Sequence, residues 1–346
     1  MRPWFAGAAP SGRPPPPIWR GRVALRILGG MKYRTLGSSD LRVSTVGLGT
    51  WAIGNDFWGA VDDEESVHAL QAGLDAGINL IDTAPAYGAG HAEEVVGRAI
   101  AGRRDDVVIA TKVGIIRTEN DFVRNLKAES VRQEIDDSLR RLGVDTIDLY
   151  QIHWPDPKTP IDETMGELLK AQQAGKFRYL GVSNFNIKQM DELRRLGGMV
   201  SLQPHYSLLK RDIEGKVVQY CIDNDIGIVN YGTLAGGILT GKFRDIPEFE
   251  EGDNRYKFYP WFKEPVWSKI QTMLEVLREI AEDRGVSVAQ VAINWTTQQP
   301  GITSALVGAK NPSQAESNAG GGDFELSQEE IDRINEAHGA NVAGVA

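Results

Sequence analysis

Four side chains of this sequence are of types that could together carry out acid–base chemistry. Asp82, Lys112 and His153 each come at the end of a short apolar segment, and Tyr87 lies five residues after Asp82. A free phenol, with a pKa of about 10, is too weak an acid for neutral pH. A lysine ammonium beside the phenol favours phenolate and lowers that pKa, and a carboxylate can hold the lysine in place. Such a group could protonate an oxygen on which negative charge develops.

The segments that must position these residues alternate regularly between two patterns. Asp62–Ala76 and Glu129–Leu142 have apolar residues at helical spacing. Gly77 and Gly143 stand where helices commonly end. Between such helices we expect eight strands, at Ser44–Leu48, Ile78–Ile81, Val107–Ala110, Thr146–Ile152, Tyr179–Val182, Val200–Leu202, Ile226–Val229 and Thr303–Val307. This pattern predicts an α/β fold, a single (β/α)8 TIM barrel, with an open doubly wound sheet as the alternative.

The open sheet lacks its usual phosphate-binding motif. The glycines of Gly47–Gly54 (GLGTWAIG) do not have the GxGxxG spacing. In a barrel, by contrast, catalytic groups come from the carboxyl ends of several strands. Ser183, Asn184, Gln203 and Tyr231 also follow predicted strands, which favours the barrel. Periodicity does not distinguish the interior face of these strands from the face that meets the helices, because both are apolar.

Composition excludes several classes of protein. The 346 residues carry a net charge of −9 with a pI near 5.2, whereas nucleic-acid binding needs a basic surface. No apolar run is long enough to span a membrane. Cys221 is the single cysteine, which excludes an internal disulfide and a thiolate zinc site, and the histidines lack metal-ligand spacing. We expect a cytoplasmic protein with no metal, nucleic-acid or membrane partner; the oligomeric state does not follow from the sequence.

The first thirty residues differ from the rest of the chain. They contain six prolines, five arginines and no acidic residue, and the run Pro14–Pro17 favours an extended chain. We expect residues 1–30 to be a disordered extension or an upstream start-site artefact, with a targeting peptide as the alternative. The barrel domain is predicted to occupy residues 31–346.

Seven segments, each after a predicted strand, resemble motifs of the aldo-keto reductase superfamily. They occur along this chain in the same order as in that superfamily. The HWP tripeptide at His153 is closest to the branch of bacterial inositol-locus proteins and potassium-channel β-subunits. The segments are Asp75–Gly88, Val107–Gly114, Asp148–Pro157, Gly181–Phe185, Leu202–Leu209, Gly236–Phe243 and Val307–Asn318.

The resemblance implies a catalytic tetrad of Asp82, Tyr87, Lys112 and His153. Tyr87 would be the general acid, Lys112 its activator and Asp82 the partner of Lys112, while His153 would orient the substrate oxygen. Each residue alone has a simpler explanation: a helix cap, a rim aromatic, a strand-end lysine and a structural histidine. Four such coincidences at strand ends, in the family's order, favour the catalytic interpretation.

The resemblance also implies NADPH bound across the barrel mouth, with NADH less expected. Ser183, Asn184 and Gln203 would hydrogen-bond the carboxamide, and Tyr231 would stack on the nicotinamide ring. Lys310 would pair with a 2′-phosphate near the helix opened by Asn311. The other expected cofactor residues are Gly49, Thr50, Trp51, Asp82, Gly232, Thr233, Leu234, Gly241, Lys242, Gly308, Gln314 and Asn318.

The expected function is NADPH-dependent reduction of an aldehyde, ketone or sugar-derived carbonyl to an alcohol. Aromatic residues near the predicted mouth suit such a small-molecule partner. The expected substrate-binding residues are Trp51, Trp58, Tyr87, His153 and Trp154. Two alternatives remain open: a dehydrogenase that oxidises a sugar or cyclitol with NADP⁺, and a non-catalytic subunit that senses NADPH.

Overall fold

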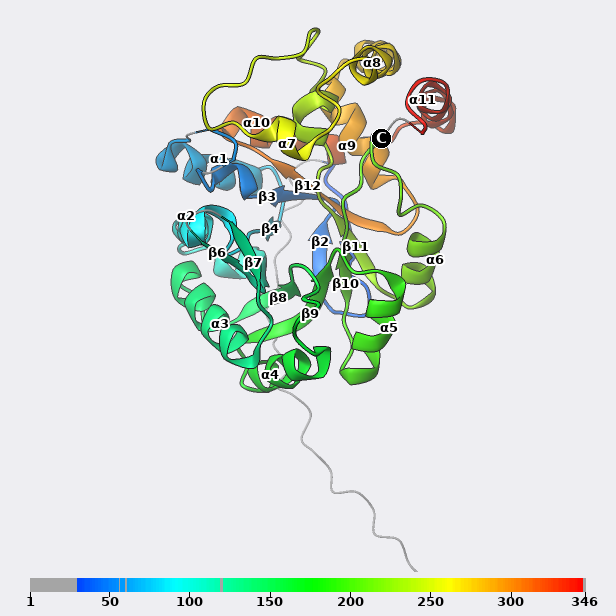
Figure 1. The fold of residues 1–346 in the computed structure, drawn as a ribbon. Coiled ribbons are helices and arrows are strands. Elements are labelled where there is room, and N and C mark those ends of the chain that lie inside the picture. Colours follow the sequence, from blue (N-terminus) through cyan, green and yellow to red (C-terminus); the bar gives the residue numbers. More distant parts are fainter. Residues whose placement is uncertain (1–29, 56, 60, 119–120, 345–346) are drawn as a thin grey trace, which may run out of the picture.

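Eight parallel strands close into a barrel in the order β10-β11-β12-β3-β4-β5-β8-β9 (Figure 1). The computed structural model describes residues 30–55, 57–59, 61–118 and 121–344. The prediction for residues 1–30 therefore lies, apart from Gly30, outside the described residues. The barrel strands are β3 (Val46–Gly49), β4 (Leu80–Asp82), β5 (Val108–Val113), β8 (Ile147–Ile152), β9 (Phe177–Ser183), β10 (Ser201–Gln203), β11 (Gly227–Asn230) and β12 (Ile302–Gly308). Each overlaps one predicted strand, so the barrel is confirmed and the open sheet is excluded.

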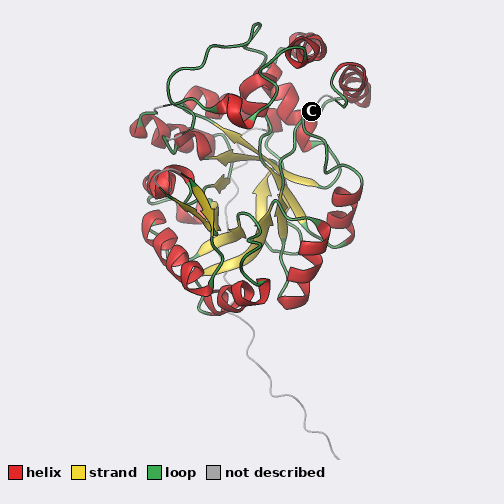
Figure 2. Cartoon of the chain, viewed as in Figure 1, coloured by secondary structure: helices red, strands yellow, loops and turns green. Residues whose placement is uncertain are grey.

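Helices surround this ring of strands (Figure 2). Their ends carry the expected signals: the Asp62 carboxylate accepts from the Glu65 N–H at 2.9 Å, and Gly143 ends its helix with φ 65°. The α-helices are α1 (Asp63–Asp75), α2 (His91–Ala99), α3 (Ala128–Leu142), α4 (Ile161–Gln173), α5 (Ile187–Leu196), α6 (Lys216–Asp223), α7 (Arg255–Phe258), α8 (Val266–Arg284), α9 (Val288–Thr297), α10 (Pro312–Ala319) and α11 (Gln328–Asn341). Short 3₁₀ helices are η1 (Trp51–Ile53), η2 (Tyr87–Gly90), η3 (Arg104–Asp106), η4 (Ala235–Thr240) and η5 (Gly320–Gly322).

An antiparallel hairpin, β1 (Tyr33–Thr35) and β2 (Arg42–Ser44), closes the amino-terminal end of the barrel. Its buried Leu36, Leu41 and Val43 pack with strand residues that include Leu80 and Leu149, in a core separate from the larger one under the helices. These strand residues therefore face the barrel interior. Because side chains alternate along a strand, Asp82 and Gln151 face the same interior at its other end.

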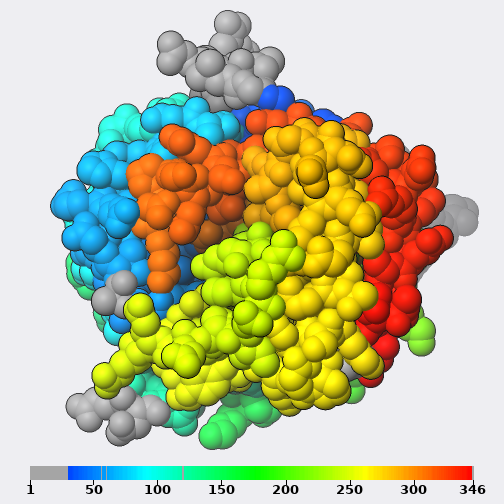
Figure 3. Space-filling model, turned by 90° about the horizontal axis from the view of Figure 1, so that it is seen from above, coloured from blue at the N-terminus to red at the C-terminus, as the bar shows by residue number. Residues whose placement is uncertain are grey.

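A second hairpin, β6 (Ile115–Arg117) and β7 (Phe122–Arg124), follows β5 at the carboxyl end of the barrel. The long segment between η4 and α8, yellow-green in Figure 3, lies beside α10 and α8. It is joined to the loop after β3, since the Asn254 N–H donates to the Phe57 carbonyl at 2.9 Å and Trp58 pairs with Asp253. Three connections thus meet around the mouth.

Candidate active site

The four predicted catalytic residues converge at the carboxyl end of the barrel. Asp82 ends β4, Lys112 lies in β5, and His153 directly follows β8. Tyr87 begins η2, the first turn beyond β4, and its ring meets the His153 ring edge-on with centroids 5.9 Å apart. Parallel strands bring these residues together because their carboxyl ends share one rim of the barrel.

Lys112 is the centre of this group. Its side chain is fully buried, and Nζ donates to Asp82 Oδ2 at 2.9 Å, to the Thr83 carbonyl at 2.9 Å and to the Tyr87 hydroxyl at 3.0 Å. Gln203 Nε2 also donates to Asp82 Oδ2, at 2.8 Å. A buried ammonium is tolerated here because each of its hydrogen-bond partners is an oxygen acceptor and one of them is a carboxylate.

Burial dominates the pKa values of the group. It raises the pKa of the Tyr87 phenol, and the nearby Lys112 charge opposes this only in part. The expectation of a net lowered phenol pKa is therefore wrong in direction, because desolvation of the phenolate outweighs the ammonium. Burial acts to lower the pKa of Lys112, but Asp82 and Tyr87 leave it raised. Burial, with Lys112, holds the pKa of His153 well below its usual value, so this imidazole is neutral.

Two glycines set the position of Tyr87. A Cβ on Gly88, which has φ 63°, would meet the Gly54 carbonyl oxygen at 2.1 Å, and one on Gly54 would meet the Gly88 nitrogen at 2.9 Å. The loop after β3 and the turn after β4 therefore approach at a distance that only glycine permits. Trp51 of the first loop stacks beside the Tyr87 ring, with centroids 6.3 Å apart.

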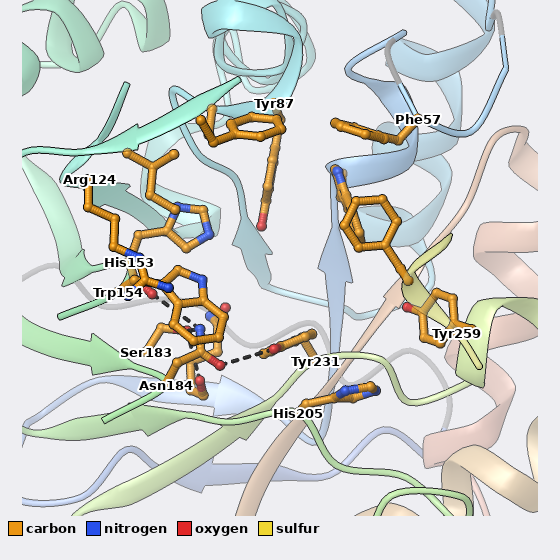
Figure 4. A pocket seen from close by; sticks show the side chains of 16 residues that line it. Phe57, Tyr87, Arg124, His153, Trp154, Ser183, Asn184, His205, Tyr231 and Tyr259 are labelled. Carbon is orange, nitrogen blue, oxygen red and sulfur yellow. Dashed lines mark hydrogen bonds between the residues drawn. The ribbon is translucent and has the colours of Figure 1, made fainter. Parts of the chain in front are cut away.

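A cavity of about 390 Å³ opens above this group (Figure 4). Trp51, Tyr87, His153 and Trp154 line it as predicted. Trp58 does not: its carbonyl accepts from Lys310 Nζ and its ring lies 5.4 Å from the Arg255 guanidinium. The remaining lining residues are Phe57, Ala86, Ile115, Phe122, Arg124, Ser183, Asn184, Gln203, His205, Tyr231, Phe258 and Tyr259.

His205 is a pocket residue to which the sequence interpretation gave no role. Its ring stacks on that of Tyr231 at 5.0 Å and 16°, and burial, helped by Lys210, lowers its pKa to about 4. A Cβ on Gly232 would meet the His205 ring at 2.4 Å, so the glycine makes room for the imidazole. The available signal was its position two residues after Gln203, on the same face.

Polar groups of the predicted cofactor set form one network in the cavity. The Tyr231 hydroxyl donates to Asn184 Oδ1 at 3.0 Å, and Asn184 Nδ2 donates to Ser183 Oγ at 2.9 Å. Ser183 Oγ in turn donates to the Gln203 carbonyl at 2.8 Å. Asn184 adopts φ 62°, a conformation that asparagine tolerates better than most residues. The network holds amide and hydroxyl groups at the cavity wall, where a carboxamide could exchange hydrogen bonds with them.

Cations collect beside the cavity around Lys310, the residue expected to pair with a 2′-phosphate. Lys242, Arg255 and Lys310 lie close together: burial lowers the pKa of both lysines, and the charge of Arg255 acts on each lysine in the same direction. Asp253 offsets part of this charge, accepting from Arg255 Nε at 2.9 Å. The arrangement fits an anionic dinucleotide, since the cations outnumber the carboxylate that pairs with them.

The other predicted cofactor residues hold this surface together. Asn318 Nδ2 donates to the Gly308 carbonyl at 3.1 Å, and Gln314 Oε1 accepts from the Lys310 N–H at 2.9 Å. Thr233 Oγ1 donates to the Leu306 carbonyl at 2.8 Å, linking the loop after β11 to β12. Gly49 ends β3 and is followed by Thr50, while Gly232, Leu234 and Gly241 flank η4.

Two kinds of feature are absent from the parts of the chain that the structure describes. They contain no group of three or more histidine, cysteine, aspartate or glutamate side chains that could hold a metal ion. Nor does any described helix combine the length and the apolar character needed to cross a membrane.

The barrel and its buried acid–base group define the class of protein. Residues 45–338 match the aldo/keto reductase family, and the chain belongs to that family of oxidoreductases. It is 43% identical over 289 residues to aldo-keto reductase YhdN of Bacillus subtilis, covering 83% of this chain and 87% of YhdN. It is 34% identical over 314 residues to the NADH-specific methylglyoxal reductase of Escherichia coli, covering 86% and 95% of the two chains.

Solved structures agree in fold. The glycerol dehydrogenase AKR11B4 from Gluconobacter oxydans superposes with a TM-score of 0.83 at 40% identity, covering 90% of this chain and 96% of that one. An aldo/keto reductase from Klebsiella pneumoniae, solved in complex with NADP and acetate, superposes with a TM-score of 0.70 at 29% identity, covering 90% and 96%.

Proposed function

We propose that this oxidoreductase reduces aldehyde or ketone carbonyls with NADPH, with Tyr87 as the general acid. The observation that carries the proposal is the hydroxyl of Tyr87, which lies 3.0 Å from the ammonium of Lys112 at the base of an aromatic cavity. Tyr87 and His153 both line that cavity, and their rings meet edge to face with centroids 5.9 Å apart. A substrate oxygen at this point would meet a proton donor and a neutral imidazole together.

The chain's own residues account for the proton transfer. Burial keeps Tyr87 protonated before reaction, so its O–H is available to a carbonyl oxygen that gains negative charge. As the proton leaves, the Lys112 ammonium stabilises the phenolate, and Asp82 keeps that ammonium in place. Neutral His153 can donate a hydrogen bond to the same oxygen and so orient the carbonyl.

A nicotinamide cofactor, when bound, supplies the hydride. Asn184, Ser183 and Gln203 would hold its carboxamide, and Tyr231, backed by the His205 ring, would provide a flat surface for its ring. Lys242, Arg255 and Lys310 supply excess positive charge for phosphates, which supports NADPH over NADH. The E. coli relative named as NADH-specific is the opposite precedent, so both cofactors should be measured.

The test compares the wild type with Tyr87→Phe, using 4-nitrobenzaldehyde and following the loss of NADPH absorbance. We expect turnover to fall by about 10²–10⁴-fold, the range for general acid catalysis, with NADPH binding retained. Tyr259→Phe is the matched control, because Tyr259 lines the same cavity but makes no hydrogen bond to Lys112. Cofactor binding is measured separately by fluorescence.

Each alternative result has a definite meaning. Tight NADPH binding without turnover on a broad panel of carbonyls would support the sensing subunit instead. Absence of NADPH binding would overturn the cofactor assignment. Equal losses in both tyrosine variants would remove Tyr87 as the acid.

A second function is favoured by the 40% identity to a glycerol dehydrogenase. In that case the same residues would act in reverse: the phenolate of Tyr87, stabilised by the Lys112 ammonium, would accept the hydroxyl proton of the alcohol, and bound NADP⁺ would take up the hydride. The ratio of kcat/KM for glyceraldehyde with NADPH to that for glycerol with NADP⁺ separates the two directions.

A further inference from the structure

A guanidinium group forms part of the cavity wall next to the catalytic histidine. Arg124 ends β7 of the second hairpin, and its side chain lies with His153 and Trp154 on one side of the cavity, opposite Phe57 (Figure 4). The guanidinium carbon is 4.8 Å from the centroid of the Trp154 ring, and Nη1 donates to the Pro155 carbonyl at 3.4 Å. Stacking on a ring reduces the freedom of an otherwise flexible exposed side chain.

Arg124 has no ionic partner among the residues that the structure describes. Arg178 and Arg141, by contrast, pair with Asp148 at 3.0 Å and with Glu93 at 2.7 Å, whereas Arg34, within the described chain, donates only to backbone carbonyls. Among the described residues, the Arg124 guanidinium is held only by the Trp154 ring and the Pro155 carbonyl. Its other N–H groups can therefore serve a ligand.

Arg124 is the one charged side chain among the described residues that line the cavity. No aspartate or glutamate is found among its described lining residues, and both lining histidines are neutral, because burial lowers the pKa of His153 and of His205. Lys112 lies beneath the cavity, already paired with Asp82. Arg124 thus makes the wall near His153 positive, while the opposite wall is aromatic.

We propose that Arg124 binds an anionic group, a carboxylate or a phosphate, on the carbonyl substrate. The planar guanidinium suits both, because its N–H groups can donate two parallel hydrogen bonds to a pair of oxygens. Arg124, His153 and Tyr87 line one cavity of about 390 Å³, so the anion would lie in the same small space as the oxygen that Tyr87 protonates. This inference rests on the proposed function and narrows it to aldehydes or ketones that carry a negative charge a short distance from the carbonyl.

Two pairs of substrates test this charge preference. 4-Carboxybenzaldehyde and 4-nitrobenzaldehyde match in shape and differ in charge, as glyceraldehyde 3-phosphate and glyceraldehyde differ by a phosphate. We expect the wild type to favour the anionic member of at least one pair in kcat/KM. Arg124→Met should lower that ratio by about tenfold, since a charge-assisted hydrogen bond of about 1.4 kcal/mol corresponds to that factor. The pair that responds identifies carboxylate or phosphate as the recognised group.

Two further variants control for charge and geometry. Lys127→Met removes the same charge from an exposed residue outside the cavity lining, and we expect it to leave the substrate ratio unchanged. Arg124→Lys keeps the positive charge but lacks the planar pair of N–H donors, so it should retain only part of the preference for the anionic substrate. Added salt should shrink the wild-type preference, because the guanidinium is exposed.

A binding measurement separates this inference from the reaction itself. Benzoate and its neutral match benzamide are titrated against the protein, and quenching of tryptophan fluorescence is followed. Tighter binding of benzoate, lost in Arg124→Met, would support the anion site even if no aldehyde were reduced, in which case the proposed function alone would fail. Equal affinity for the two ligands, together with equal kcat/KM within both substrate pairs, would overturn the inference.

Discussion

The same strands form both ends of the barrel, but their interior side chains are apolar at the amino end and polar or charged at the carboxyl end. At the amino end, Leu80 and Leu149 pack with Leu36 of the N-terminal hairpin, and this end is closed by apolar contact. Two residues further along the same strands, Asp82 and Gln151 replace leucine in the interior. One strand therefore contributes to stability at its start and to chemistry at its end.

The two ends therefore contribute in opposite ways to the free energy of folding. The amino end gains free energy from burying leucine side chains, about 1.5–3 kcal/mol for each. The carboxyl end buries an ammonium and a carboxylate, which lose hydration and regain it only through each other and through neighbouring oxygens. We therefore expect variants at the two ends to separate stability from activity.

The largest effect is expected from Lys112→Met at the carboxyl end. It would leave the buried Asp82 carboxylate without its cation, lowering the free energy of unfolding by about 3–5 kcal/mol, and it would abolish carbonyl reduction. Chemical denaturation and the aldehyde assay measure the two effects. The double variant Asp82→Asn/Lys112→Met should recover much of the stability but none of the activity. Full activity in the single variant would refute the role assigned to Lys112.

Leu36→Ala is expected to lower stability through the apolar core at the amino end of the barrel. Leu36 is fully buried in the barrel interior, and its truncation should cost about 2–5 kcal/mol through lost burial and the cavity left behind. At a temperature where the variant remains folded, kcat should stay near that of the wild type, because this core consists of apolar residues outside the tetrad and only its far side packs against Tyr231 of the predicted cofactor site. A fall in kcat without a change in melting temperature would show that the two ends are coupled.

A smaller effect, on the pH dependence of stability, is expected from Glu134, which lies on a helix outside the strands of the barrel. Glu134 of α3 accepts from the Gly114 N–H at 3.0 Å, next to the carboxyl end of β5, and burial raises its pKa from 4.5 to about 7, with Glu93 acting in the same direction and Arg141 against it. The folded protein then binds more protons than the unfolded chain between these pH values. Its stability should fall as the pH rises from about 4.5 to 7, and then level off.

Glu134→Gln should remove this decline and gain about 1–3 kcal/mol over the wild type above pH 7. Melting temperatures measured across the pH range provide the test. Glu129→Gln, an exposed change on the same helix, is the control and should follow the wild type. Parallel pH curves for the wild type and Glu134→Gln would contradict the assignment.

The barrel could be predicted from sequence because each strand is a short apolar run followed by a helix. Because Gly143 ends the preceding helix, the short apolar segment Thr146–Ile152 is readily predicted as a strand. The convergence of Asp82 and Lys112 follows from the same pattern, since both stand at carboxyl ends of parallel strands. The side of the strands on which they lie could not be read, because Leu80 and Ile81 are equally apolar and only the hairpin core distinguishes them.

The part of the cavity wall that the second hairpin supplies could not be predicted from local sequence pattern. The residues of β7, Phe122, Val123 and Arg124, are exposed and show no alternation, so nothing in the sequence indicated a strand there or a wall of the pocket. The net direction of the Tyr87 pKa depends on how deeply the ring is buried, which spacing cannot show. Trp58 was expected in the pocket for its ring, whereas the backbone pairing with Asp253 holds it among the cations.

The hairpin at the amino end has a practical consequence for handling the protein. The Lys32 carbonyl accepts from the Thr45 N–H at 2.9 Å, so the chain enters the fold at the closed end. The substrate cavity opens at the other end of the same strands. A tag or solid support attached ahead of Gly30 would therefore leave the cavity facing the solution, and immobilised protein should keep its substrate access.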